Sequence, residues 1–540
     1  MKRFLYDHAA LNPVSFHMPG HKGGALFREY GYEEFLENFM DMDVTEIPGA
    51  DNLFDADGII DEVQKRYARL YGARRSWMIV NGTSGSLIAA ILAVSRMWAA
   101  CKSKPRFVIG RNCHKAVFNG LRLAGAEPVY AYPEIVGEYG IAGEVTPGEI
   151  GRLVKENPDA AGVIITSPNY YGICSDIEAI AQVAHEAGMV LIVDQAHGAH
   201  LKFFHDFGCG SGMPGVTENQ GADMMPLGAE DQGADMMPLA AEDQGADIVC
   251  CSTHKTLASM TQSAVLNLCS DRVDPALIDD CLQMVESSSP SYVLMTSLDI
   301  NAELIENHGE QLFTRWRENL DYFYSQVADV PGLNIMKFGS MDPTKLNIDM
   351  GIPGAQLEEK LNERGIFPEL YTGNILMCMT GIGNIRGDYD KLLDALREIG
   401  DDVAEEIAAK EVAEEIPCDD VAEEIAGDDE CICAGSDADV IAGISDSDDN
   451  TVVDDADYEK QPLPGEFVAV PEDSSLVPIE EAGGMICAYS IIPYPPGSPL
   501  VCPGEIITEE IVRYASRLWQ RGYKMIGIDR EGRVRASAKR

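Results

Sequence analysis

Four short apolar runs, each bounded by turn-forming residues, set the strongest limit on how this chain can fold. They are FVIG (107–110), GVIITSP (162–168), MVLIVD (189–194) and ADIVCCS (246–252). The runs are continuously apolar, so both faces of each predicted strand are buried. Between the second and third runs, DIEAIAQVAHEAG predicts an amphipathic helix capped by Ser175 and ended by Gly188. This pattern predicts a three-layer αβα domain around a mostly parallel sheet.

A small, hydroxylated turn follows the apolar run MIV (78–80). It reads NGTSGSL (81–87) and leads into an apolar helix. Backbone N–H groups at a helix N-terminus, with the hydroxyls of Thr83, Ser84 and Ser86, would form a cradle for a phosphate. The same residues also suit an ordinary capped helix start, so both interpretations stay open here.

Asp194 ends the run MVLIVD and is followed by QAHGAH. A carboxylate at the end of a buried strand needs a cationic or hydrogen-bonding partner, or its pKa rises until the group is neutral. A protonated ring nitrogen would be one such partner. Two alternatives are that Asp194, His197 and His200 bind a metal ion, or that the histidines hydrogen-bond within the core.

The run ADIVCCSTHK brings Ser252, His254 and Lys255 to the end of a buried strand, where a charged ammonium is unfavourable. A lysine there is either salt-bridged or kept as a neutral amine that attacks carbonyl groups. A Schiff-base lysine, a phosphate cradle and a carboxylate for a pyridinium nitrogen are together what pyridoxal 5′-phosphate requires. The sequence therefore predicts a pyridoxal phosphate site at the carboxyl edge of the sheet.

Six stretches of the chain carry a resemblance to a known family. They are SFHMPGHKGG (15–24), RNCHKAVFNGLRLAGAEPVY (111–130), ITSPNYYGICSDIEAIAQVAHEAGMVLIVDQAHGAHL (165–201), STHKTLASMTQSA (252–264), SSSPSYVLMTSLD (287–299) and IPYPPGSPLVCPGE (492–505). In these stretches the chain resembles the lysine, ornithine and arginine decarboxylases of pyridoxal-phosphate fold type I. The resemblance is to the short biosynthetic form, which lacks an N-terminal wing domain.

The resemblance implies roles for individual residues. Lys255 would bind the cofactor aldehyde, Asp194 would face its pyridine nitrogen, and His114 would stack on its ring; these three are the predicted catalytic residues. Ala196 would pack against the other face of the ring. The remaining predicted cofactor-binding residues are Thr83, Ser84, His197, Ser252 and His254.

Three positions depart from the family's pattern. Gln195 stands where an acidic residue is common, Ser86 replaces a usual glycine, and Phe54 sits where a histidine is frequent. These departures leave the details of phosphate and substrate binding open, and do not affect the expectation of pyridoxal phosphate.

The far cationic group of a basic amino acid needs an anionic acceptor. Glu369 in FPELY and Glu505 in PGE are the predicted substrate-binding residues, and the YPPG turn before Glu505 would stiffen its loop. Asp299 is a further candidate, for which we favour a solvated or salt-bridged surface carboxylate.

The formal net charge of −47 and the pI near 4.4 argue against nucleic acid and anionic membrane surfaces as partners, because both repel an acidic protein. The chain opens MKRFLYDHAALNP, without the apolar core of a secretory signal, and has no run of eighteen apolar residues. With fourteen scattered cysteines, this indicates a cytoplasmic protein with reduced thiols.

Cys418, Cys431 and Cys433 could hold zinc, but a second ligand pair is missing, so no metal is predicted.

Two segments are interpreted as insertions. The unit QGADMMPLGAED is copied almost unchanged over residues 220–243, which indicates a duplicated surface loop. Residues 401–460 hold 23 acidic and 2 basic residues, which favours a solvated or partly helical tract. Around them we expect a cofactor-binding domain with its N-terminal segment (1–300), a helical linker with the first part of a smaller α+β domain (301–400), and the C-terminal part of that domain (461–540).

The predicted function is pyridoxal-phosphate-dependent decarboxylation of arginine, lysine or ornithine, with a weak preference for arginine from the resemblance alone. Residues 287–291 resemble a loop that family members contribute across a dimer interface, which implies a homodimer or larger assembly with the site between subunits. Two alternatives remain: an aminotransferase of the same fold, which commonly anchors the substrate carboxylate with an arginine, and a non-catalytic homologue that binds a partner.

Overall fold

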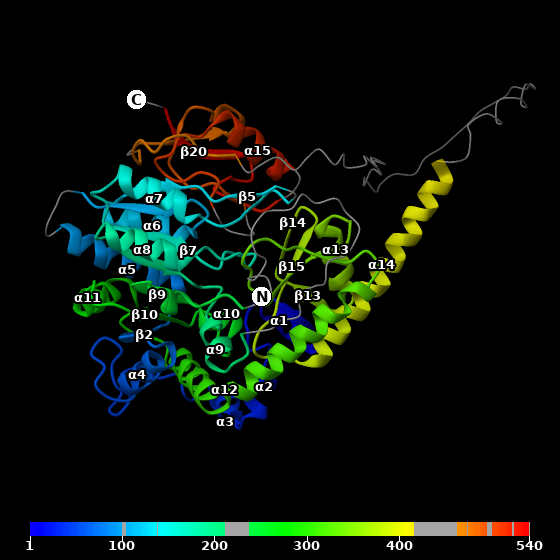
Figure 1. Ribbon diagram of the computed structural model, residues 1–540, viewed down its shortest axis with the longest axis horizontal. Helices are drawn as coiled ribbons and strands as arrows, with labels where there is room; N and C mark the ends of the chain where they lie inside the picture. The colour runs from blue at the N-terminus through cyan, green and yellow to red at the C-terminus, as the bar shows by residue number, and fades with distance from the viewer. Residues whose placement is uncertain are drawn as a thin grey trace, which may run out of the picture.

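A seven-stranded sheet forms the centre of the larger domain, with strands in the order β2-β10-β9-β8-β7-β3-β4 (Figure 1). The computed structural model describes residues 1–99, 104–137, 139–210, 237–414, 462–471, 473–493, 499–520 and 523–538. The strands are β2 (Arg75–Ile79), β3 (Arg106–Gly110), β4 (Glu127–Ala131), β7 (Gly162–Thr166), β8 (Val190–Asp194), β9 (Ile248–Cys251) and β10 (Ala264–Leu268).

The four predicted runs form the central strands β3, β7, β8 and β9, and all four pair in parallel. The prediction of a mostly parallel sheet is therefore confirmed. β10 is the exception, because it pairs antiparallel with both β2 and β9.

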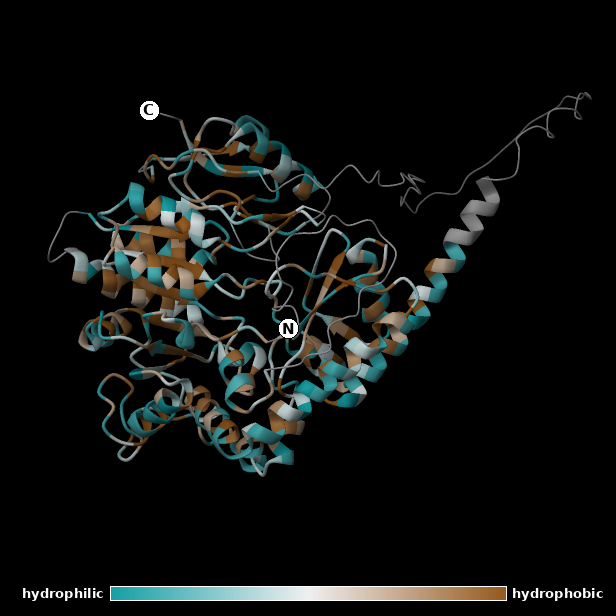
Figure 2. Ribbon diagram, in the orientation of Figure 1, coloured by the Kyte–Doolittle hydropathy of each residue, from teal (hydrophilic) through white to brown (hydrophobic). Residues whose placement is uncertain are grey.

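Helices cover both faces of this sheet, and neighbouring residues of one strand enter different cores. In β7, Val163 and Ile165 pack into one core while Ile164 packs into the other. One face is covered by α5 (Gly82–Ala99), α6 (Lys115–Ala124) and α11 (Pro275–Val285), and the other by α4 (Ile59–Tyr71), α7 (Pro147–Glu156) and α8 (Ile177–Glu186). Figure 2 shows the strands in brown between these helices, as expected for strands buried on both faces.

The cap of α8 corrects one sequence prediction. Asp176, not Ser175, is the N-cap, and its side chain accepts a hydrogen bond of 3.0 Å from the amide of Ala179. The hydroxyl of Ser175 instead accepts a hydrogen bond from the amide of Val145. A carboxylate at this end of the helix adds favourable charge that a hydroxyl lacks.

A long helix, α12 (Tyr292–Gln326), leads from the large domain to a second, antiparallel sheet. That sheet has the order β11-β12-β15-β14, with bounds β11 (Asn334–Ile335), β12 (Lys345–Asp349), β14 (Leu370–Thr372) and β15 (Ile375–Met379), and it packs with α13 (Gly354–Glu363). The C-terminal residues form β16 (Ser475–Pro478), β17 (Ile486–Cys487) and β20 (Arg533–Ser537), which share a core with α15 (Glu509–Gln520).

The N-terminal segment joins the two domains at the site. After α1 (Lys2–Ala10), β1 (Val14–Phe16) pairs in parallel with β13 (Ile366–Pro368) of the smaller domain. The amide of Gly20 then donates a hydrogen bond of 2.8 Å to the carbonyl of His254. A Cβ at Gly20 would collide with the backbone of Thr256 and Leu257, so only glycine allows this approach.

The two insertions are only partly described. α14 (Arg386–Glu414) continues into the acidic tract, and the rest of that tract, with Cys418, Cys431 and Cys433, lies outside the described residues. Of the duplicated unit, only residues 237–243 are described. The prediction of a surface loop is wrong for this part, because Met237, Ala240 and Ala241 are buried.

None of the helices in the described residues combines the length and apolar character needed to span a bilayer.

Candidate active site

The carboxyl ends of the parallel strands meet at one edge of the large sheet, where such sheets bind ligands. β2 leads into α5 with Thr83, β3 is followed by His114, β8 ends at Asp194, and β9 is followed by Lys255. The structure thus brings together the predicted residues of four strand ends.

Lys255 lies in the single turn α10 (Thr253–Thr256). Its Nζ is 2.7 Å from Nε2 of His197 and 5.8 Å from the centroid of the Tyr170 ring. Burial lowers the pKa of Lys255 to about 8, with the charge of Lys345 acting in the same direction and that of Asp194 opposing it. At pH 7 a pKa of about 8 leaves roughly a tenth of this amine neutral, far more than for an ordinary lysine, which suits a nucleophile.

Asp194 is 2% exposed at the end of β8. Within the described residues its hydrogen bond comes from the amide of Ala196, at 3.2 Å to Oδ1. Burial raises the pKa of Asp194, while the charge of Lys255 and this amide oppose the rise. A cationic ring nitrogen would stabilise the ionised carboxylate.

The predicted phosphate cradle is assembled from two strand ends. The hydroxyls of Thr83 and Ser252, 169 residues apart in sequence, are in contact, and both residues are buried. Ser84 lies in the first turn of α5. The hydroxyl of Ser86 donates to the carbonyl of Thr83 at 2.9 Å, so it is bonded within the helix. A phosphate cradle at this place would therefore consist of a helix N-terminus with the hydroxyls of Thr83, Ser84 and Ser252.

Two further histidines lie near the lysine, one on another element and one beside it in α10. His114 is the N-cap of α6, where its Nδ1 accepts a hydrogen bond of 3.2 Å from the amide of Ala116. Burial and then the charge of Lys255 lower the pKa of His114 to about 4. His254 donates from Nδ1 to the carbonyl of Ser263 at 2.8 Å, and burial lowers its pKa to about 4. Both rings are therefore neutral at physiological pH.

His197 contacts Lys255 directly. Burial and the charge of Lys255 hold the pKa of His197 well below its usual value, so its neutral Nε2 accepts from the lysine. Its Nδ1 is buried and has no hydrogen-bond partner among the described residues. The centroid of its ring lies 4.4 Å from the centroid of the Tyr170 ring. The site thus holds a free donor that a bound group could satisfy.

The three residues of the alternative metal site, Asp194, His197 and His200, form hydrogen bonds with different partners. His200 contacts Thr256 and Asp342, whereas His197 contacts Lys255 and Asp194 bonds to the amide of Ala196. Among the described residues, no three side chains of the metal-ligating types form a group that could hold a metal ion.

Glu369, between β13 and β14, lies close to the lysine. Its Oε2 accepts a hydrogen bond of 2.9 Å from the amide of Met18, and its Oε1 accepts one of 2.8 Å from the hydroxyl of Tyr170. Its charge raises the pKa of Lys255, although burial outweighs it. One donor on each oxygen leaves the carboxylate able to accept further hydrogen bonds.

The other two candidate carboxylates are already paired. Glu505 is fully buried, and its Oε2 lies 3.0 Å from Nη2 of Arg111, which joins the C-terminal residues to the end of β3. Asp299 pairs with Arg66 at 2.7 Å and is half-exposed, as expected for a salt-bridged surface carboxylate. The YPPG turn lies outside the described residues.

Sequence reasoning missed Tyr170, Asp342 and Lys345. Tyr170 follows β7 at the same sheet edge, so the strand-end argument applied to Lys255 also pointed to it. Lys345 is the first residue of the buried strand β12, whereas the signal used for Lys255 was a lysine at the end of a buried strand, so that signal did not identify it. No pattern linked Asp342 to His200, 142 residues away.

Two family models match this chain. The Orn/Lys/Arg decarboxylase major domain matches residues 1–225 and 230–338, and the Orn/Lys/Arg decarboxylase C-terminal domain matches residues 453–532. Together they span most of the chain on both sides of the acidic tract.

Relatives of this chain include decarboxylases with different substrates. An arginine decarboxylase of Bacillus subtilis (strain 168) is 30% identical over 530 residues, covering 94% of this chain and 91% of the relative. The lysine decarboxylase LdcA of Pseudomonas aeruginosa is 25% identical, covering 94% of this chain and 74% of the relative. The solved constitutive lysine decarboxylase of E. coli has a TM-score of 0.65 at 21% identity, over 96% of this chain and 79% of that chain, which supports the fold. The chain therefore belongs to the Orn/Lys/Arg decarboxylase family and is a carboxy-lyase with the fold of the type I pyridoxal-phosphate enzymes.

Proposed function

We propose that this chain decarboxylates L-arginine to agmatine and carbon dioxide, with pyridoxal 5′-phosphate bound to Lys255. The observation that carries the proposal is a lysine amine of lowered pKa at the same sheet edge as a buried carboxylate and a hydroxyl-lined helix start. Arginine is supported by the arginine decarboxylase of Bacillus subtilis, which this chain matches over most of both lengths. Lysine and ornithine are substrates of the same class.

The residues present fit pyridoxal phosphate. The cradle of Thr83 and Ser252 at the start of α5 suits a phosphate. Asp194 is a buried carboxylate that a protonated pyridine nitrogen would stabilise. The orphaned Nδ1 of His197 is a buried donor that an oxygen of a bound group would satisfy. Each feature lies next to Lys255 or at the same edge of the sheet.

Pyridoxal phosphate, when bound, supplies an aldehyde that combines with amines and a ring that withdraws electrons from the substrate Cα. Asp194 would hold the proton at the pyridine nitrogen by its negative charge. Lys255 would bind the aldehyde through Nζ, and His114 would help to hold the ring. Lys255 or a histidine beside it delivers the proton that replaces the carboxylate at Cα.

Glu369 is proposed to bind the distal cation of the substrate. Its carboxylate is oriented by Met18 and Tyr170, so a guanidinium or ammonium would meet a fixed acceptor. Glu505 is less suited to this role, because its charge is compensated by the buried guanidinium of Arg111.

An aminotransferase of the same fold is less well supported, because the arginine that follows β3 near His114 is already paired. Arg111, three residues before His114, is engaged with Glu505. It is therefore not free to anchor a substrate carboxylate in the way that transamination commonly requires.

We also propose a homodimer, a cytoplasmic location and a role in polyamine biosynthesis. The dimer is supported by the resemblance of residues 287–291 to a loop that crosses the interface in the family. A reducing compartment is supported by the cysteines of the described residues, which form no disulfide.

The proposal is tested by incubating the purified protein and pyridoxal phosphate with arginine, lysine or ornithine in turn. We expect carbon dioxide and agmatine from arginine, at a higher kcat/KM than for the other two. Cadaverine or putrescine as the main product would reassign the substrate. A keto acid without gas would indicate transamination, and no product from any substrate would indicate a non-catalytic homologue.

A further inference from the structure

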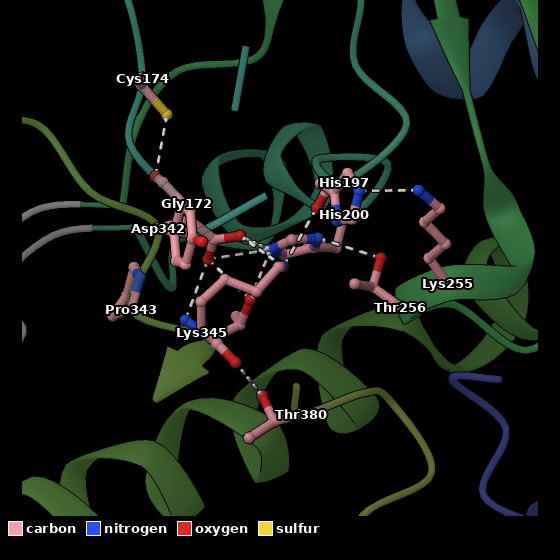
Figure 3. A network of polar contacts seen from close by, with 12 residues as sticks. Gly172, Cys174, His197, His200, Lys255, Thr256, Asp342, Pro343, Lys345 and Thr380 are labelled. Atoms are coloured by element: carbon pink, nitrogen blue, oxygen red, sulfur yellow. Dashed lines mark hydrogen bonds and ion pairs between the residues drawn. The ribbon is translucent and has the colours of Figure 1, made fainter. Parts of the chain in front are cut away.

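A buried polar network connects the smaller domain to the lysine of the site (Figure 3). It contains Lys345 at the start of β12, Asp342 in the preceding loop and His200 after β8. All three side chains are fully buried. Removing an ion pair from water is unfavourable, and hydrogen bonds to both partners must offset this.

Lys345 uses all three of its N–H groups. Its Nζ donates to Oδ2 of Asp342 at 2.9 Å, to the hydroxyl of Thr344 at 3.0 Å and to the carbonyl of His197 at 3.1 Å. The imidazole of His197 in turn lies 2.7 Å from Nζ of Lys255. Lys345 therefore holds the backbone of the residue whose ring contacts the amine of the site.

A second path runs from Asp342 to the residue after Lys255. Nε2 of His200 donates to Asp342 at 3.2 Å, and Nδ1 of the same ring accepts from the hydroxyl of Thr256 at 3.1 Å. Burial lowers the pKa of His200, so its ring is neutral. Although burial acts in the opposite direction, Lys345 and His200 hold the pKa of Asp342 below its usual value, so it is ionised.

We infer that the buried ion pair of Lys345 and Asp342 positions the Lys255 amine for the cofactor, through the His197 carbonyl on one side and the His200–Thr256 hydrogen bond on the other. The inference rests on the proposed role of Lys255. Lys345 and Asp342 act through other residues, so they are positioning residues. Because both belong to the smaller domain, the amine is held correctly only when the two domains are packed together.

The test measures the reactivity of Lys255 in the full-length protein without added cofactor. Acetic anhydride labels neutral amines, and peptide mass spectrometry gives the labelling rate of Lys255 against pH. The parent should show a midpoint near pH 8, as expected from its lowered pKa. Two variants are compared with the parent. Lys345→Met removes the buried cation alone. The double variant Asp342→Asn with Lys345→Met removes both charges of the pair, so that no buried charge is left without a partner. The other charged and titratable groups around Lys255 stay unchanged in these variants; they are Asp194, His114, His197, His254 and Glu369.

Lys345→Met should raise the labelling midpoint of Lys255 by about one pH unit, which means about tenfold slower labelling at pH 7, because a positive charge that lowers the Lys255 pKa is lost. The double variant loses the negative charge of Asp342 as well, so its midpoint should shift less, and it should differ from the parent in the labelling rate at high pH, where every amine is neutral. Lys202→Met is the matched control: it removes a lysine that pairs with Asp243 at 2.8 Å outside the network, and should keep the parent midpoint.

A correctly folded double variant with the parent midpoint and rate would overturn the inference and leave the pair a structural role. If Lys345→Met does not fold, the inference is tested with the double variant alone.

Reductive trapping of added pyridoxal phosphate on Lys255 is measured on the same samples. If the parent does not trap the cofactor, the proposed function is wrong. The labelling of Lys255 without cofactor tests the positioning role of the ion pair independently of that result.

Discussion

The hydroxyl of Tyr170 donates a hydrogen bond of 2.8 Å to Oε1 of Glu369, and the ring of the same tyrosine lies 5.8 Å from Nζ of Lys255. Tyr170 thus stands between the amine that would bind the cofactor and the carboxylate that would bind the far end of the substrate. A basic amino acid at Lys255 would extend past this ring to bring its cation to Glu369.

Glu369→Gln should weaken arginine binding with little effect on the chemical step. The amide keeps the size of the side chain but loses the charge, so the KM for arginine should rise by about tenfold or more, which corresponds to about 1.4 kcal/mol or more of lost binding. Steady-state kinetics with arginine measure this. Asp299→Asn, at the surface pair with Arg66, is the control and should leave KM unchanged. An unchanged KM for Glu369→Gln would exclude Glu369 as the acceptor.

Uptake of pyridoxal phosphate by the cofactor-free protein should depend on the protonation of Lys255. Only the neutral amine attacks the aldehyde, and the pKa of Lys255 is about 8. The uptake rate should therefore rise about tenfold per pH unit below that value and level off above it. Stopped-flow absorbance between pH 6 and 10 measures the profile. A rate that kept rising to the usual lysine pKa would show that burial does not lower the pKa of Lys255.

Glu505→Gln should reduce stability and leave substrate binding intact. The substitution leaves the buried guanidinium of Arg111 without its anionic partner, so the free energy of unfolding should fall by about 3–5 kcal/mol. Denaturant unfolding followed by tryptophan fluorescence measures the loss. A raised KM for arginine with unchanged stability would instead assign Glu505 to the substrate site.

Gln195 and Glu242 should behave as a coupled pair. Nε2 of Gln195 donates to the carboxylate of the half-buried Glu242 at 2.8 Å, and Oε1 of Gln195 accepts from the amide of Ala241 at 2.7 Å. Gln195→Glu would place a second carboxylate against Glu242 and destabilise the protein, and Glu242→Gln added to it should restore stability. The coupling energy in a double-mutant cycle should be about 1–3 kcal/mol. Additive effects would contradict the pairing.

This pair also shows why a departure from the family pattern could not be interpreted from sequence. Gln195 raised doubt because an acidic residue is common there, and its partner Glu242 belongs to the duplicated unit that we expected to be a surface loop. Only the folded chain places the end of that unit beneath the strand ends of the site.

The strand ends were predictable because their signal is local. A continuous apolar run followed by Asp194 or Lys255 identifies a buried strand and its last polar residue, and the parallel arrangement then brings together Thr83 and Ser252 from distant positions. Lys345 lies in the antiparallel sheet of the smaller domain, and Asp342 lies in the loop before its strand β12. Their role depends on how that domain packs against the large one, and no sequence period encodes this packing.

The central claim is that the amine of Lys255 binds pyridoxal phosphate. Borohydride reduction of the purified protein with pyridoxal phosphate, followed by peptide mapping, tests it most directly. We predict a single pyridoxyl label, on Lys255, and no label on the peptide in Lys255→Ala. A label on another lysine, or none on the parent, would contradict the claim.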